Sequence, residues 1–134
     1  MAIKLYREAY ALNHADSGYH LALMIAYGRG TSQDASAAME IFRKCSLELN
    51  HAPSMRYLGI FAVNGHGAPD GISDYQSAVA WFDKCARTGD PTVGAQCGRE
   101  RDEVKSKING AEAEIREKMS KYEVPIDIDI TPYD

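Results

Sequence analysis

The 134-residue sequence has no long apolar run. Nowhere do about 18 consecutive apolar residues occur, which is the minimum for a helix that spans a membrane, so we expect no membrane insertion. The N-terminus also lacks the apolar segment of a signal peptide, and helical periodicity begins at Ala2 with no capping residue before it. This start suggests that a signal peptide or earlier repeats preceded it. The compartment stays open between the cytoplasm, which we favour, and the periplasm.

Cysteine is scarce, and its spacing matches no common metal or redox motif. The three cysteines, Cys45, Cys85 and Cys97, are odd in number and form no C-x-x-C pair, and there is no H-x-x-x-H pair. A zinc site needs converging ligands of this kind, so we expect neither a metal nor any other cofactor. We favour three buried thiols in a reducing compartment.

Positive charge is also in short supply. The chain has 15 Lys and Arg against 19 Asp and Glu, a net charge of −4, which argues against a nucleic-acid-binding surface or a polybasic membrane patch. The excess acid is local, because residues 122–134 include Glu123, Asp127, Asp129 and Asp134 and no basic residue. The rest of the chain is therefore neutral overall, and we expect its partner to be another protein instead of a nucleic acid or a small-molecule substrate.

What the sequence does contain is an internal repeat with an offset of 37 residues. The identical pairs are Asn13 and Asn50, His14 and His51, Ala15 and Ala52, Leu21 and Leu58, Gly28 and Gly65, and Gly30 and Gly67. Repeats of roughly 20–50 residues indicate stacked supersecondary units. Stacked helical units build extended binding surfaces more often than active sites.

Amphipathic periodicity predicts helices over residues 2–12, 16–27, 34–49 and 53–64. Asp16 or Ser17 is expected to cap the second helix and Asp34 the third, while Gly28 and Gly65 are stop signals. A third unit opens near residue 74 after an inserted loop at 68–73 and turns at 89–91. No glycine stops its second helix, which we expect to continue toward residue 108, with strong helix formers beyond.

These patterns divide the chain into a repeat region over residues 1–110, a helical extension over 111–121 and a tail over 122–134. In the tail, Ile126, Ile128 and Ile130 alternate with polar residues, which is typical of an extended segment with one apolar edge. Two interpretations remain open. The tail covers an exposed apolar end or frays as a terminus, or it adds a strand to the sheet of a partner.

The assembled pattern resembles the Sel1-like repeat family. The matching residues of the second unit are Ala38, Phe42, Leu58, Gly59, Gly65, Gly67 and Asp74, and those of the first are Tyr6, Ala9, Tyr19, Leu21, Gly28, Gly30 and Asp34. The resemblance covers residues 2–98 and implies an all-α fold, a right-handed α-solenoid of about three antiparallel helix pairs. It also implies a protein-binding adaptor or scaffold, often bacterial, although some members are immunity proteins that neutralise a toxin.

Disulfide-bearing members of the family place cysteines at matched sites in each unit. Cys45 and Cys85 occupy the Ala9 position of successive units, but no cysteine stands at the usual partner site. A bond between Cys85 and Cys97 within one helical hairpin is the alternative to free thiols.

The first helices of the units carry a repeated basic stripe, which is our candidate binding site. Its members are Arg7, Arg43, Lys44, Lys84 and Arg87, to which we add the tail residues Ile126, Ile128 and Ile130 as partner-binding. If these helices line the concave face, the stripe suits carboxylates of an acidic partner. The alternatives are an ordinary solvated face, because acidic residues lie nearby, and self-association in which the acidic tail occupies this groove.

Catalysis is not expected. The glycines of Gly28-Arg29-Gly30 follow a helix, whereas a phosphate-binding loop must precede one. His14 and His51 recur in the same turn, which favours hydrogen bonding at helix ends, and no spacing suggests a nucleophile with a histidine and an acid. The sequence therefore predicts a binding protein and not an enzyme.

Overall fold

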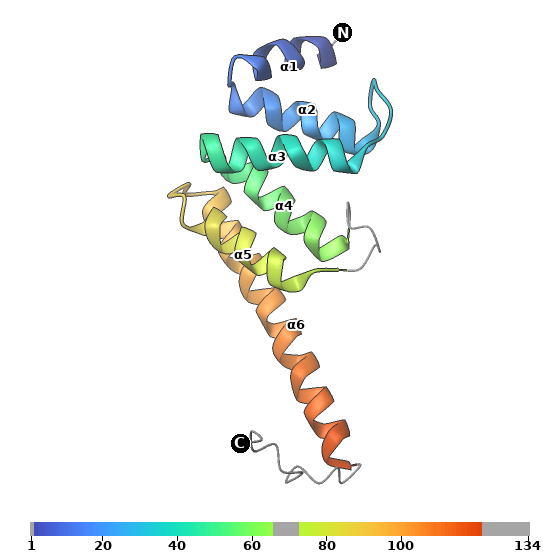
Figure 1. Cartoon of the computed structure of the whole chain (residues 1–134). Coiled ribbons are helices and arrows are strands. Elements are labelled where there is room, and N and C mark those ends of the chain that lie inside the picture. The colour runs from blue at the N-terminus through green and yellow to red at the C-terminus, as the bar shows by residue number, and fades with distance from the viewer. Residues whose placement is uncertain (1, 66–72, 122–134) are drawn as a thin grey trace, which may run out of the picture.

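The computed structural model describes residues 2–65 and 73–121, and these ranges consist of helices and turns. The helices are α1 (Ala2–Ala11), α2 (Ala15–Tyr27), α3 (Ala35–Leu49), α4 (Ala52–Asn64), α5 (Tyr75–Ala86) and α6 (Val93–Lys121). Each packs against the next one in the chain (Figure 1). The all-α prediction is confirmed, and no strand occurs within the described ranges.

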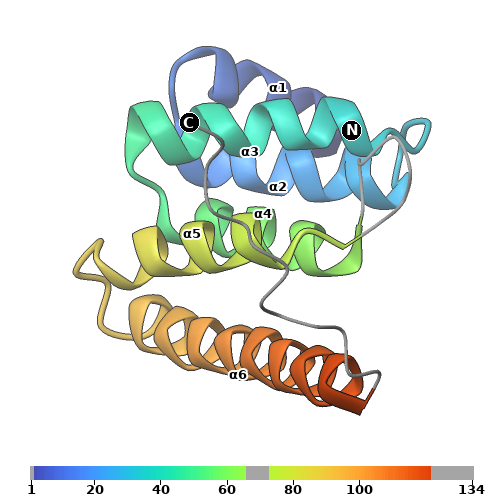
Figure 2. The same cartoon turned by 60° about the horizontal axis from the view of Figure 1, so that its bottom comes forward.

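The helices form three hairpins, α1 with α2, α3 with α4, and α5 with α6. Between hairpins, α2 packs on α3, α4 packs on α5, and α4 also touches α6. Figure 2 shows the hairpins stacked one after another, with α6 at one end of the stack. A chain that packs each unit only on its neighbours is a helical repeat, as the sequence predicted.

The turn inside each hairpin contains one residue in the left-handed conformation. Asn13, Asn50 and Gly89 stand at equivalent positions, and their φ angles are 64°, 51° and 89°. This left-handed conformation is open to glycine and tolerated by asparagine, whereas it strains most other residues. A residue that tolerates this conformation therefore recurs where the chain reverses in each unit.

Side chains next to these turns cap the second helix of the first and the third hairpin. His14 is the N-cap of α2, and its Nδ1 accepts a hydrogen bond from the backbone N–H of Ser17 at 3.2 Å. The prediction that Asp16 or Ser17 caps α2 is wrong, because the helix begins at Ala15 and both residues lie in its first turn. In the third unit Asp90 stands in place of the histidine. Its Oδ1 accepts hydrogen bonds from the backbone N–H groups of Thr92 and Val93 at the start of α6. The turn histidines thus act at helix ends, as expected.

The core is built from repeat-equivalent positions of α3 and α5. The pairs Ala38 and Ala78, Phe42 and Phe82, and Cys45 and Cys85 are each at most 2 % exposed. One apolar cluster surrounds Phe42 and a second surrounds Phe82. At Gly59 a Cβ would lie 2.6 Å from the Phe82 ring, so a glycine is needed there for α4 and α5 to approach closely. Core residues therefore recur from one unit to the next, as the turn residues do.

Cys85 of α5 and Cys97 of α6 form a disulfide, with their Cα atoms 5.9 Å apart. The favoured prediction of three free thiols is wrong for these two residues, and the alternative pairing is the one observed. Cys45 is free and buried, and burial raises the pKa of its thiol. The sequence spacing alone does not show whether Cys85 and Cys97 pair, because pairing depends on how α5 docks against α6.

α6 is a single helix of 29 residues, which confirms that no glycine stops it. Its apolar side chains up to Ile108 pack on the second cluster, whereas every residue from 109 to 120 is exposed. The helix crosses the expected boundary after residue 110 without a break, so the division into repeat region and extension stays a prediction. The tail, with Ile126, Ile128 and Ile130, and most of the inserted loop lie outside the described residues.

Candidate functional site

The predicted basic stripe lies on α1, on α3 and at the end of α5. Arg7 and Arg43 stand at equivalent positions of α1 and α3, and both are exposed. Neither makes an ion pair or a hydrogen bond with residues 2–65 or 73–121. The Lys44 ammonium lies 4.9 Å from the centre of the Tyr10 ring, a cation–π contact that links α3 to α1. In the first two units, two arginines are therefore available to a partner.

In the third unit the basic side chains contact other side chains of the same chain. Lys84 lies 5.9 Å from the centre of the Trp81 ring. At the position of Arg7 and Arg43 the chain has Asp83, whose two oxygens lie 2.9 Å from Arg87 Nε and 2.9 Å from Arg101 Nη1. The hydrogen bond from Arg101 is the main reason that the pKa of Asp83 is lowered. The stripe thus changes character between the second and the third unit.

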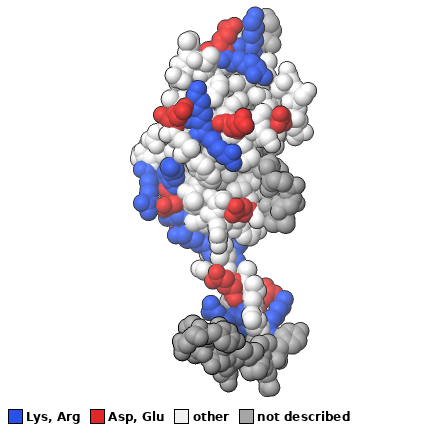
Figure 3. Space-filling model, viewed as in Figure 1, with Lys and Arg blue, Asp and Glu red and all other residues white. Residues whose placement is uncertain are grey.

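Figure 3 shows this face of the molecule with its charges. Lys and Arg atoms form separate groups over the N-terminal helices and around the start of α6, and Asp and Glu atoms lie between them. The surface is mixed in sign and does not form one continuous basic strip.

A serine, a histidine and an aspartate do come together, although no spacing in the sequence suggested it. His51 Nε2 lies 2.7 Å from Asp16 Oδ1, and His51 Nδ1 lies 2.8 Å from Ser54 Oγ. Ser54 is fully buried in the first turn of α4, so its hydroxyl cannot reach a substrate. The arrangement joins the start of α2 to the start of α4. We interpret it as a structural link between units.

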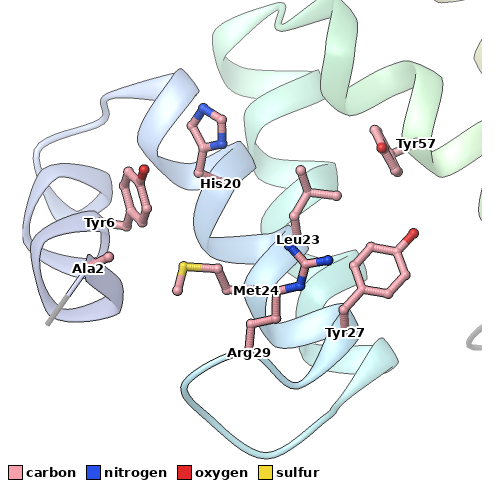
Figure 4. Close-up of a pocket in the computed structure, with 8 residues that line it drawn as sticks. All are labelled: Ala2, Tyr6, His20, Leu23, Met24, Tyr27, Arg29 and Tyr57. Carbon is pink, nitrogen blue, oxygen red and sulfur yellow. The ribbon is translucent and has the colours of Figure 1, made fainter.

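A second candidate surface is a hollow of about 460 Å³ that crosses α2. Its lining residues are Ala2, Tyr6, His20, Leu23, Met24, Tyr27, Arg29 and Tyr57. Figure 4 shows Tyr6 of α1 on one side, Tyr57 of α4 on the other, and the Arg29 side chain lying back along α2 toward Leu23. We call this hollow the α2 groove. It is lined mainly by apolar and aromatic groups, with one permanent positive charge.

Ring packing holds the walls of the α2 groove in place. On one side the Tyr6 ring stacks on His20 with centroids 5.3 Å apart. On the other, Tyr57 stacks on the buried Phe42 at 5.7 Å and meets Tyr19 edge-on at 5.6 Å. Burial, with the neighbouring Tyr57 hydroxyl, raises the pKa of Tyr19 to about 12, so the Tyr19 phenol stays protonated. A groove whose walls are already ordered loses little conformational entropy when it binds a ligand.

Sequence reasoning missed the α2 groove because its residues come from three helices and one loop. The available signal was the concentration of tyrosines on the first two units. The sequence cannot show that Tyr6, Tyr27 and Tyr57 lie around one hollow, since that depends on how α1 and α4 flank α2.

Among the described residues, no three His, Cys, Asp or Glu side chains are grouped as a metal site would require. No helix in the same ranges is long and apolar enough to cross a bilayer.

Comparison with known proteins gives one informative likeness. The chain is similar to the crystal structure of a Sel1 repeat protein from Oxalobacter formigenes, with 30 % sequence identity and a TM-score of 0.59. The similarity covers 72 % of this chain and 38 % of that protein, so this chain spans well under half of its length. No family model and no curated protein matches the sequence. The likeness in both sequence and structure agrees with the repeat pattern found above.

Proposed function

Because this chain belongs to the Sel1-like repeat proteins, whose fold is generally a protein-interaction module and usually not catalytic, we propose that it binds an acidic segment of another protein. The proposed binding surface is centred on Arg7 and Arg43, with Lys44 beside them. Lys84 and Arg87 lie at its edge, where they also contact Trp81 and Asp83.

One observation carries the proposal. Two exposed arginines stand at the same position of successive units, and neither has an ionic partner within the described residues. Arginine binds carboxylates through two parallel hydrogen bonds, so such a pair suits a partner segment with carboxylates at a matching spacing. A role in folding would instead pair them, as Arg87 and Arg101 are paired with Asp83.

The test uses the full chain as bait in a bacterial lysate, with bound proteins identified by mass spectrometry. The variant carries Arg7→Glu and Arg43→Glu, and the control carries Arg99→Glu, another exposed arginine on α6. We expect the variant to lose a partner that the wild type and the control retain, because a reversed charge repels carboxylates. Equal recovery by all three chains would overturn the proposed surface.

The same assay ranks this surface against the tail. Reversing Arg43 and Lys44 is expected to weaken binding more than removing residues 122–134, and the opposite ranking would contradict the proposal. The nature of the partner then defines the role. Several assembly components would support an adaptor or scaffold. A single enzyme that is bound one to one and loses its activity would support the alternative of an immunity-type inhibitor.

A further inference from the structure

The α2 groove carries a positive charge that no acidic lining residue balances. The guanidinium of Arg29 makes no ion pair or hydrogen bond with any part of the chain that the structure describes, and none of the groove's lining residues is a carboxylate. The floor, formed by Leu23 and Met24, is apolar. The groove is therefore complementary to a segment in which a bulky apolar side chain lies beside a carboxylate.

The chain contains one segment of this chemistry. In residues 123–134, Ile126, Ile128 and Ile130 alternate with Asp127 and Asp129, and no lysine or arginine is present. If the segment is extended, alternate side chains point in opposite directions, so isoleucines face the floor while aspartates reach the rim. We propose that the α2 groove of one copy of the chain binds residues 123–134 of a second copy.

Chain length favours a second copy over the same one. The exposed part of α6, residues 109–121, leads away from the body, and thirteen helical residues span about 20 Å. Five further residues reach Ile126, a distance of at most about 18 Å even when fully extended. Ile126 therefore cannot span the exposed part of α6 backwards, and the groove of its own chain lies further away, in the first two hairpins. A neighbouring copy has no such restriction.

The inference does not depend on the proposed function. The α2 groove is built on α2, α4 and the N-terminal part of α1, whereas the proposed partner surface is centred on Arg7 and Arg43. A chain that fails to bind an acidic partner can still associate with itself, and the reverse also holds. Variants that separate the two surfaces are available, because Arg29 lies outside the basic stripe.

The test is sedimentation velocity on full-length chains over a wide concentration range. We expect the wild type to self-associate, and Arg29→Glu alone to weaken this association by about tenfold or more, since it places like charges together. The double variant Asp127→Lys with Asp129→Lys should also associate more weakly, because its tail then has the same charge as Arg29. Mixing the two variants should restore association, because each tail then meets a groove of opposite charge.

Two variants outside the α2 groove serve as controls. Arg99→Glu and the pair Arg7→Glu with Arg43→Glu should leave self-association unchanged, and circular dichroism should show the same helix content in every variant. A wild type that stays monomeric at all concentrations would overturn the proposal. So would variants that associate as well as the wild type, or a mixture that is not rescued.

Discussion

The first two repeat units and the third share a core but differ at the surface. Phe42 and Phe82 occupy the same buried position, as do Cys45 and Cys85. In contrast, Arg43 of α3 is replaced by the paired Asp83 in α5. The third unit is also closed by a disulfide, whereas Cys45 is free.

The difference shows which positions of a repeat are set by packing and which by other demands. Each unit must present the same apolar shape to its neighbour, so the core positions recur. Surface charges face no such requirement. In the third unit they stabilise the hairpin of α5 and α6, whereas in the first two they leave Arg7 and Arg43 exposed. The proposed partner surface therefore lies on the first two units.

The largest expected effect tests the shared core. Phe42→Ala and Phe82→Ala should each lower the free energy of unfolding by about 3–5 kcal/mol, because each removes a buried ring from a packed cluster. Urea denaturation measures both. Ile115→Ala is the control, since Ile115 is 58 % exposed on α6 and should change stability by less than about 0.5 kcal/mol. A large loss of stability in only one of the two phenylalanine variants would contradict the equivalence of the units.

A smaller effect should be confined to the third unit. Reducing the bond between Cys85 and Cys97, which are 12 residues apart, should lower the free energy of unfolding by about 3 kcal/mol, because the unfolded chain regains the entropy of that loop. Denaturation with and without a reductant measures the loss. In the variant Cys85→Ala with Cys97→Ala the reductant should have no further effect. If it still destabilises that variant, the bond is not the cause.

The sequence predicts the local features of the fold well, and it does not predict the contacts between different helices. The order of helices, the cap at Asp34 and the stops at Gly28 and Gly65 are local properties, and the structure confirms them. The disulfide, the α2 groove and the contact between His51 and Asp16 each join residues from different helices. Their distances depend on docking, which no spacing in one sequence reveals. The cap of α2 was missed for a local reason, because histidine is a less usual N-cap than aspartate or serine.

The smallest expected effect concerns the link between the first two units, which the third unit lacks because Asp90 stands in place of the histidine. The hydrogen bond from His51 lowers the pKa of Asp16 below its ordinary value of 3.8. A carboxyl whose pKa is lower in the folded chain than in the unfolded one stabilises the fold above the unfolded pKa. That stability is lost as the pH falls from about 4 through the folded pKa.

Asp16→Asn should therefore be less stable than the wild type near neutral pH, and the difference should vanish in strong acid. Its size should be about 0.5 kcal/mol or less, because the Asp16 side chain is 74 % exposed and solvent screens the pair. Urea denaturation of both chains at several pH values measures the difference. Asp102→Asn is the control, since that carboxylate pairs with Arg101 beside it on α6, within a single unit. A difference that stays constant down to strong acid would mean that Asp16 acts through packing in the first turn of α2, and that the units are joined by their apolar cores alone.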